Sequence, residues 1–372
     1  MIYLDNAATT KMFKEAIDAQ VNVENDFFAN PSSLHSFAMK AEDLVEETRK
    51  IVSNYMGVNK REIYFTKGAT ESNNIAIKSF DNSKTIALIS KIEHASVDNT
   101  FRTSNNFKKK YYVKNDKYGF IDLEDLKSLM REKVNFVSIM HVNNEFGTIQ
   151  NINEIGKIIK NINPNCIFHV DGTQAFAKIP LNIDDTIDMY SFSGHKIHGP
   201  KGIGGIYISD RVKKFIKPIL DGGYQEKISS GTTNVSGIYS MGVALKKLLE
   251  LNPYKNVDKV RNYLLNKLKN IEDIYVISPN KNYSPYILEV AFANIKSEVL
   301  LHFLESEEIY VSSGSACSLG NNSRVLSSIY VPEKYIDGSI RFSFSYENTI
   351  EEMDKTFEVL NNGVNMIREV MI

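Results

Sequence analysis

Hydrophobic and polar positions follow two patterns over roughly the first two thirds of the chain, one with helical periodicity and one of short apolar runs. Between Ala41 and Met56 the apolar residues recur every three or four positions and Gly57 follows, which predicts an amphipathic helix closed by a glycine cap. Short apolar runs of strand length alternate with helical or loop segments. Strands of this kind pack as a mostly parallel sheet covered on both faces, so the pattern predicts an α/β core. The expected strands lie in residues 85–90, 135–142, 166–171, 189–193 and 202–209.

The rhythm changes after Asn252. A helical stretch over Tyr254–Leu268 leads to strand-like runs separated by a short helical run, and a last helix opens with Thr349 and Glu352 at the spacing of a capping box. This pattern is typical of a smaller α+β domain, and we expect the extreme N-terminus to pack with it. The predicted organisation is a large domain over residues 15–252 and a small domain formed by residues 1–14 and 253–372.

Composition and charge narrow the class of protein. Of 372 residues, 42% are hydrophobic and 24% are charged, as in water-soluble globular enzymes. The net charge of -1 comes from scattered basic and acidic residues and favours neither nucleic-acid nor membrane binding, and the lysine run 108–110 is interpreted as a solvated face. No apolar run approaches the ~18 residues of a membrane span and no signal-peptide pattern is present, so we expect a cytoplasmic protein. Two cysteines without zinc-site spacing predict neither disulfides nor a metal centre.

Polar residues that directly follow the expected strands are the first candidates for chemistry. Ligands of open α/β sheets bind at the carboxyl ends of the strands. Asp171 and Gln174 follow one run, and His195 and Lys196 follow another. The segment Gly68–Thr70 follows a third run and enters a helix. These segments are expected to meet at one edge of the sheet.

Three of these features together describe one cofactor. The small-residue turn Gly68–Thr70 exposes helix N–H groups that can bind a phosphate. Lys196 at a strand end can form a Schiff base with an aldehyde, and the Asp171 carboxylate, if buried, keeps a pyridine nitrogen protonated. The combination predicts pyridoxal 5′-phosphate. Two of the features have a simpler interpretation when taken alone, with Thr70 as a helix N-cap and Lys196 as a solvated surface charge.

Ten short motifs then carry a family resemblance, in order along the chain: LDNAATT, NPSSLH, FTKGATESNN, IEHASV, NNEFGTIQ, FHVDGTQ, SFSGHKIHGPKG, SGTTNVSGI, SSGSAC and IRFSFS. From Leu4 to about Tyr346 the sequence resembles the pyridoxal-phosphate-dependent cysteine desulfurases of the class V aminotransferase family. The resemblance implies an aspartate aminotransferase-like large domain. It also implies conversion of L-cysteine to L-alanine with transfer of the sulfur to an enzyme cysteine as a persulfide, for iron-sulfur cluster or tRNA thiolation pathways.

The resemblance assigns the cofactor contacts residue by residue. Lys196 would hold the cofactor and act as catalytic base, Asp171 would pair with the ring nitrogen, and Gln174 would donate to the ring hydroxyl. His94 would stack on the ring and take part in catalysis. The phosphate would be held by Ala69, Thr70, Ser193 and His195, with Thr232 contributed by the second subunit of a homodimer.

The substrate and the sulfur have their own predicted residues. The resemblance implies that Asn143, also counted among the cofactor contacts, and Arg341 orient the substrate carboxylate, which suits the fork of a guanidinium. Cys317, in a run of serine and glycine, would accept the sulfur as a persulfide and pass it to a sulfur-acceptor protein. Cys166 lies in a predicted strand and is interpreted as a small buried hydrophobic residue.

Simpler roles and other functions stay open at this point. Arg341 fits a sheet-edge ion pair, Asn143 a turn cap, Gln174 a helix surface, and His94 and His195 a buried core. Two positions depart from the family: Ser229 stands where an arginine is usual, and Arg324 where a histidine is usual. The loop after Cys317 is also short, from which we hypothesise a restricted sulfur acceptor. The alternatives to a desulfurase are a selenocysteine lyase or class V aminotransferase on the same fold, or a non-catalytic paralogue.

Overall fold

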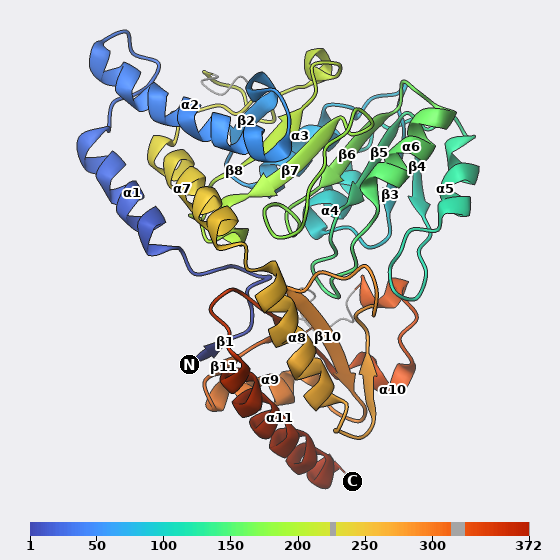
Figure 1. The fold of residues 1–372 in the computed structure, drawn as a ribbon. Helices are drawn as coiled ribbons and strands as arrows, with labels where there is room; N and C mark the ends of the chain where they lie inside the picture. The colour runs from blue at the N-terminus through green and yellow to red at the C-terminus, as the bar shows by residue number, and fades with distance from the viewer. Residues whose placement is uncertain (224–227, 314–323, 372) are drawn as a thin grey trace.

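The apolar runs form the centre of a seven-stranded sheet in the upper lobe of the molecule (Figure 1). The structure is a computed structural model that describes residues 1–223, 228–313 and 324–371. In the sheet, β8 runs antiparallel to its neighbours β2 and β7, and the remaining pairings are parallel, so the predicted mostly parallel sheet is confirmed. The order across the sheet is β2 (Ile63–Thr66), β8 (Gly204–Ile208), β7 (Met189–Ser193), β6 (Ile167–Asp171), β5 (Phe136–Met140), β3 (Ile86–Ser90) and β4 (Lys109–Val113).

Successive side chains of each strand enter two different hydrophobic cores. In β5, Val137 and Ile139 join one core while Phe136 joins the other, as the two-residue period of a strand requires. The first core is covered by α1 (Lys14–Asp26), α2 (Ser36–Met56), α5 (Leu123–Met130), α6 (Ile152–Ile162) and α7 (Val235–Leu251). The second core is covered by α3 (Ala69–Lys78) and α4 (Ala95–Thr103). Burial on both faces explains why the strands read as continuous apolar runs.

The predicted amphipathic helix is α2. It ends at Met56, and Gly57 adopts the left-handed conformation with φ 69° that a glycine cap supplies. The helix begins earlier than the apolar pattern predicts, because His35 serves as its N-cap and accepts a hydrogen bond from the Ala38 N–H at 3.1 Å. Histidine is outside the usual N-cap residues, so the sequence carries no start signal at this position.

The lower lobe contains an antiparallel sheet covered by helices (Figure 1). Its strands, in order, are β12 (Ser312–Ser313), β13 (Ser339–Ser343), β10 (Ile287–Phe292) and β9 (Ile274–Val276). The helices are α8 (Tyr254–Leu268), α9 (Ser297–Ser306), α10 (Glu333–Ile336) and α11 (Ile350–Met371). Thr349 and Glu352 exchange backbone-to-side-chain hydrogen bonds of 3.2 Å at the start of α11, as the capping-box spacing predicts.

The N-terminal segment connects the two lobes. Its strand β1 (Ile2–Tyr3) pairs in parallel with β11 (Ile309–Tyr310) of the lower lobe. A few residues later, the Thr10 N–H donates to the carbonyl oxygen of His195 in the upper lobe at 3.0 Å. The residues in between therefore run along the junction of the lobes, which is where the site lies. Short 3-10 turns complete the structure: η1 (Lys60–Glu62), η2 (Gly194–Lys196), η3 (Lys213–Phe215) and η4 (Leu326–Ser328).

Candidate active site

A cavity of about 740 Å³ lies at the carboxyl ends of the parallel strands. Gly68 follows β2, Asp171 ends β6 and Ser193 ends β7, and all three line the cavity. Asp5 of the N-terminal segment and Arg341 of β13 line it from the lower lobe. Because ligands of open α/β sheets bind at this edge, the cavity is the candidate active site.

Most of the residues predicted for the site line this one cavity. Asn143 and Thr232 are absent from its lining within the described part of the chain. Cys317 falls in residues 314–323, outside the described residues. Those that do line the cavity are Ala69, Thr70, His94, Asp171, Gln174, Ser193, His195, Lys196 and Arg341.

The Lys196 amine is held by the N-terminal segment. Lys196 ends the 3-10 turn η2 that directly follows β7. Its Nζ donates to the carbonyl oxygen of Ala7 at 2.5 Å and to that of Ala8 at 2.7 Å. Both carbonyls belong to residues that line the cavity. The interpretation of Lys196 as a solvated surface charge is therefore wrong.

The Asp171 carboxylate is buried and held by three donors. Its Oδ1 accepts from the N–H and the hydroxyl of Thr173 at 3.0 and 2.5 Å, and its Oδ2 accepts from Asn73 Nδ2 at 2.8 Å. Asp171 is 3% exposed and Asn73 is fully buried. Sequence reasoning missed both residues that supply these donors, although Asn73 and Thr173 stand inside quoted motifs. The available signal was an asparagine on the buried face of the helix that begins at Ala69.

The turn at Gly68 leaves the start of α3 open to the cavity. Gly68 is the N-cap of α3 with φ 139°, a left-handed conformation that favours glycine, and no side chain caps the helix. The N–H groups of the first turn of a helix lack partners within the helix and carry the positive end of its dipole. Thr70 is the second residue of the helix, so its interpretation as the N-cap is wrong. The turn has the chemistry of an anion site.

Burial keeps both site histidines neutral at pH 7. The His94 ring is exposed to the cavity but surrounded by protein, and this desolvation lowers its pKa. Because its Nδ1 accepts the Ser96 N–H at 3.1 Å, the ring proton of neutral His94 is on Nε2. For His195, burial and then the nearby Lys196 ammonium lower the pKa to about 4. Two neutral rings therefore stand beside the Lys196 amine.

Gln174 and Asn143 differ from expectation in opposite ways. Gln174 is buried and lines the cavity, so its interpretation as a helix-surface residue is wrong. Asn143 is fully buried, and its amide is already used: Nδ2 donates to the Ile92 carbonyl of a neighbouring loop, and Oδ1 accepts from two backbone N–H groups of its own loop. This bonding is that of a turn cap and leaves the predicted carboxylate contact of Asn143 without support. Its neighbour Asn144 lines the cavity, and the Asn144 Oδ1 atom has no hydrogen-bond partner among the described residues.

Arg341 forms an ion pair and also lines the cavity. Its Nη2 forms an ion pair with Asp5 Oδ1 at 2.8 Å, and its Nη1 donates to the Asn144 carbonyl at 3.0 Å. Arg341 and Asp5 both line the cavity. The guanidinium is thus already paired with a carboxylate inside the cavity.

Three other residues singled out in the sequence, Thr232, Ser229 and Arg324, lie outside the lining of the cavity. Thr232 is exposed and lines a neighbouring hollow of about 280 Å³ that shares Lys67 and Gly202 with the main cavity. Ser229 Oγ donates to Glu71 Oε1 at 2.9 Å, in the first turn of α3. Arg324 donates to the carbonyl oxygens of Lys91 and Glu93, in the loop that precedes His94.

The described residues show neither a metal site nor a membrane segment. No group of three histidine, cysteine, aspartate or glutamate residues in the described ranges is arranged to hold a metal ion. No described helix is long and apolar enough to cross a membrane. The groups that line the cavity are amines, carboxylates, a guanidinium, neutral imidazoles and a helix start.

Comparison with known proteins adds the family. The model of the class-V aminotransferase family matches residues 2–356. A cysteine desulfurase IscS of Dictyoglomus turgidum is 37% identical over 99% of this chain and 96% of its own length. A NifS/IcsS protein homolog of Lactobacillus delbrueckii subsp. bulgaricus is 40% identical over 95% of both proteins.

Solved structures agree with the sequence relatives. A NifS-like protein matches with a TM-score of 0.91 and 33% identity, over 98% of this chain and 99% of the other. A structure described as SspA in complex with cysteine matches with a TM-score of 0.81 and 30% identity, over 94% and 100% of the two chains. These matches confirm the resemblance and the predicted fold. The chain belongs to the class-V aminotransferase family, in the group of the IscS and NifS cysteine desulfurases.

Proposed function

We propose that this protein is a pyridoxal-phosphate-dependent cysteine desulfurase that converts L-cysteine to L-alanine and takes up the sulfur as a persulfide on Cys317. One observation carries the proposal: Lys196, Asp171 and the open start of α3 line the same cavity as the Arg341 guanidinium. An amine, a ring-nitrogen partner, a phosphate site and a carboxylate site are what this cofactor and an amino-acid substrate require.

The residues present fit the cofactor. Asp171 is buried and held by three donors, so it presents a fixed carboxylate for a pyridinium nitrogen. The turn at Gly68 offers N–H groups to a phosphate, with Ser193 and His195 lining the same cavity. Pyridoxal phosphate, when bound, withdraws electrons from the substrate Cα. We assign to Gln174 a donor role toward the ring, because its Nε2 carries two hydrogens and the Ala7 carbonyl takes one of them.

Different residues of the protein then have different roles toward the substrate. The Lys196 amine accepts the Cα proton, and two backbone carbonyls hold that amine at the cavity. Arg341 binds the substrate carboxylate, which displaces Asp5 from the guanidinium. His94, whose proton is on Nε2, offers a neutral donor at the cavity wall. Neutral histidines beside Lys196 avoid like-charge repulsion with its ammonium form.

Sulfur transfer is assigned to Cys317 from the sequence. The substrate C–S bond breaks and a new S–S bond to the Cys317 sulfur forms; the proton of the thiol balances the one that the product carbon takes up to give alanine. The residues on both sides of segment 314–323 lie at the site: Ser312 lines the cavity, and Arg324 contacts the loop before His94.

The test is mass spectrometry after incubation with L-cysteine. We expect alanine release and one added sulfur atom on the Cys317 peptide. The Cys317→Ser variant should lose both while keeping the visible absorption of the bound cofactor. Cys166→Ser is the matched control, because Cys166 is buried and burial raises the pKa of its thiol, so it should leave both readouts unchanged. Undiminished alanine release by Cys317→Ser would instead favour the lyase alternative, and undiminished conversion of cysteine to its keto acid would favour the aminotransferase alternative.

The active unit is proposed to be a homodimer in the cytoplasm that passes sulfur to an iron-sulfur scaffold or a tRNA-thiolation protein. Thr232 lies outside the cavity of its own chain, which is consistent with a contact to the partner's phosphate site. Large apolar side chains are exposed in the loop between α1 and α2 and in the first turns of α2, with Phe28 at 70%, Leu34 at 101% and Met39 at 62% exposure. Exposed apolar groups of this kind mark association surfaces. Light scattering on the purified protein should give the mass of a dimer.

A further inference from the structure

A buried lysine stands beside the cavity and has no role in the chemistry above. Lys178 is 6% exposed, although lysine is almost never buried without an ion pair. No carboxylate of the described residues forms an ion pair with it. Burial, and then the positive charges of Lys196 and Arg341, lower its pKa to about 7. The ring of Tyr286 in the lower lobe is the aromatic group facing its ammonium, at 5.8 Å.

The Lys178 amine begins a chain of hydrogen bonds that ends at Lys196. Lys178 Nζ donates to Gln174 Oε1 at 3.0 Å, and Gln174 Nε2 donates to the Ala7 carbonyl oxygen at 2.8 Å. The same carbonyl oxygen accepts from Lys196 Nζ at 2.5 Å. The two lysines are thus joined through one side-chain amide and one backbone carbonyl.

This chain determines which way the Gln174 amide faces. A lysine offers donors only, and a backbone carbonyl offers an acceptor only. Gln174 must therefore present Oε1 to Lys178 and Nε2 to Ala7, which leaves the second hydrogen of Nε2 for a ligand. Amine and ammonium both donate, so the orientation holds whether Lys178 is neutral or charged.

We propose that Lys178 is a positioning residue of this site: by donating to Gln174 Oε1 it holds the Gln174 amide with its N–H groups toward the Ala7 carbonyl and the cofactor. The inference rests on the proposed function, because it takes pyridoxal phosphate as the ligand. A purely structural lysine is a poor alternative. A methionine of similar length fills the same space without a charge to desolvate, so packing alone gives no reason for a lysine here.

The experiment is a double-mutant cycle on the holoenzyme, with Lys178→Met, Gln174→Ala and the double variant. The readouts are the dissociation constant of pyridoxal 5′-phosphate and the pH midpoint of its visible absorption band. Each single variant should weaken binding roughly 10-fold, which is the effect of losing one buried hydrogen bond. Each should also raise the pH midpoint, because the form of the cofactor with a deprotonated ring hydroxyl loses a hydrogen-bond donor. The double variant should be no worse than Gln174→Ala alone, since Lys178 acts through Gln174.

Controls separate positioning from general destabilisation. Lys160→Met removes another poorly exposed lysine, at the opposite end of the sheet, and should change neither readout. If Lys178→Met does not fold, Lys178→Ala adds no bulk and carries the same expectations. A variant that titrates and binds like the wild type, or an effect that adds in full to that of Gln174→Ala, would overturn the role of Lys178. A wild-type protein that binds no pyridoxal phosphate would overturn the proposed function instead.

Discussion

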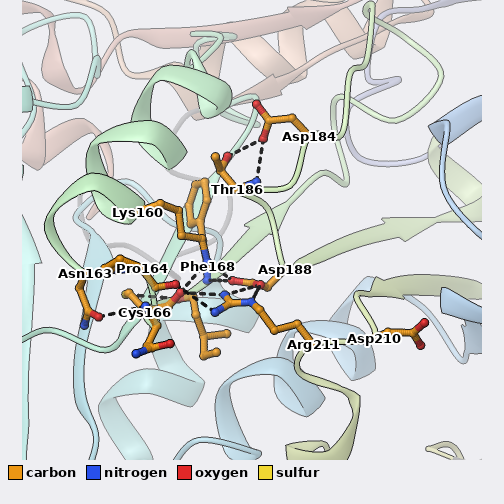
Figure 2. Close-up of polar contacts among 12 residues, drawn as sticks. Lys160, Asn163, Pro164, Cys166, Phe168, Asp184, Thr186, Asp188, Asp210 and Arg211 are labelled. Atoms are coloured by element: carbon orange, nitrogen blue, oxygen red, sulfur yellow. Dashed lines mark hydrogen bonds and ion pairs between the residues drawn. The ribbon is translucent and has the colours of Figure 1, made fainter.

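The two ends of strands β6 and β7 differ in how their buried charged side chains are paired. Before the amino ends, the Asp188 carboxylate is buried and accepts from Lys160 at 2.7 Å, from Arg211 at 2.5 Å and from the Phe168 N–H at 2.8 Å. Figure 2 shows the side chains of Lys160 and Arg211 converging on this carboxylate. After the carboxyl ends, Lys178 is buried near two other cations, and no described carboxylate pairs with it.

This difference separates a cluster that stabilises the fold from a site built for a ligand. Around Asp188 every charge has a partner, and Arg211 and Lys160 also donate to the Cys166 carbonyl, which ties the starts of two strands to α6 and to the loop after β8. Among the described residues that line the cavity, the cations outnumber the carboxylates, so the lining lacks part of the balancing negative charge: the cations are Lys67, Lys196, Lys201 and Arg341, and the carboxylates are Asp5 and Asp171. A cofactor phosphate and a substrate carboxylate are anions and would supply it.

The largest effect is expected from Lys196→Ala. Loss of the amine that accepts the Cα proton should reduce alanine release from cysteine by about 10³-fold or more. Lys160→Met is the control, because it removes a lysine of the amino-end cluster and should keep turnover per folded molecule near that of the wild type. A comparable loss of turnover in both variants would contradict the assignment of the functional amine to the carboxyl ends of the strands.

Asp188→Ala should be the most destabilising change at the amino ends. It leaves Lys160 and Arg211 without their carboxylate, and breaking such a buried pair costs about 3 kcal/mol or more of unfolding free energy. Asp210→Ala is the matched control, because Asp210 is 72% exposed and its ion pair with Lys213 is 3.9 Å long, so about 0.5 kcal/mol or less is expected. Urea unfolding of both variants measures the difference; equal losses would contradict it.

Lys178→Met should change how stability depends on pH. The pKa of Lys178 is about 7 in the folded chain against 10.5 in the unfolded chain, so between these values the unfolded chain binds more protons. The contribution of Lys178 to the free energy of unfolding therefore rises as the pH increases from 7 to 10.5 and is constant below 7. Urea unfolding of apoprotein should show that the stability of the wild type relative to Lys178→Met is greater at pH 10 than at pH 7. Equal changes in the unfolding free energy of the two proteins would contradict a buried lysine with a lowered pKa.

Asn73→Ala should have the smallest of these effects. It removes one of the three donors to Asp171, and the affinity for pyridoxal 5′-phosphate should fall about 5-fold. The adjacent Asn74 donates to the Thr70 carbonyl and not to Asp171, so Asn74→Ala is the control. Equal affinities of the two variants would show that Asn73 does not support the ring-nitrogen partner.

Local sequence pattern predicted the parts of the fold that local pattern determines. The apolar runs became buried strands, and the bounds of α8 follow the predicted stretch Tyr254–Leu268. The reversed direction of β8 was not predicted, because strand direction depends on long-range connections. β4 was missed because its lysines read as a solvated face; it is the edge strand, where lysine is common because it discourages pairing with other chains.

The candidate site was also predicted only in part. Residues of known chemistry at strand ends, such as Asp171 and Lys196, were predicted because the topology of an α/β sheet brings them together. The groups that hold them were missed: Ala7 acts through its backbone carbonyl, and Asn73 and Lys178 through contacts distant in sequence. Asn143 was assigned by motif, and only the packed loop reveals that its amide is already used.

The most direct test of the central claim is to reduce the purified protein with borohydride and map the modified lysine by peptide mass spectrometry. If the carboxyl end of β7 holds the functional amine, a pyridoxyl group should be found on the Lys196 peptide, and Lys178 and Lys160 should be unmodified. A pyridoxyl group on another lysine, or none on a protein saturated with pyridoxal 5′-phosphate, would contradict the account.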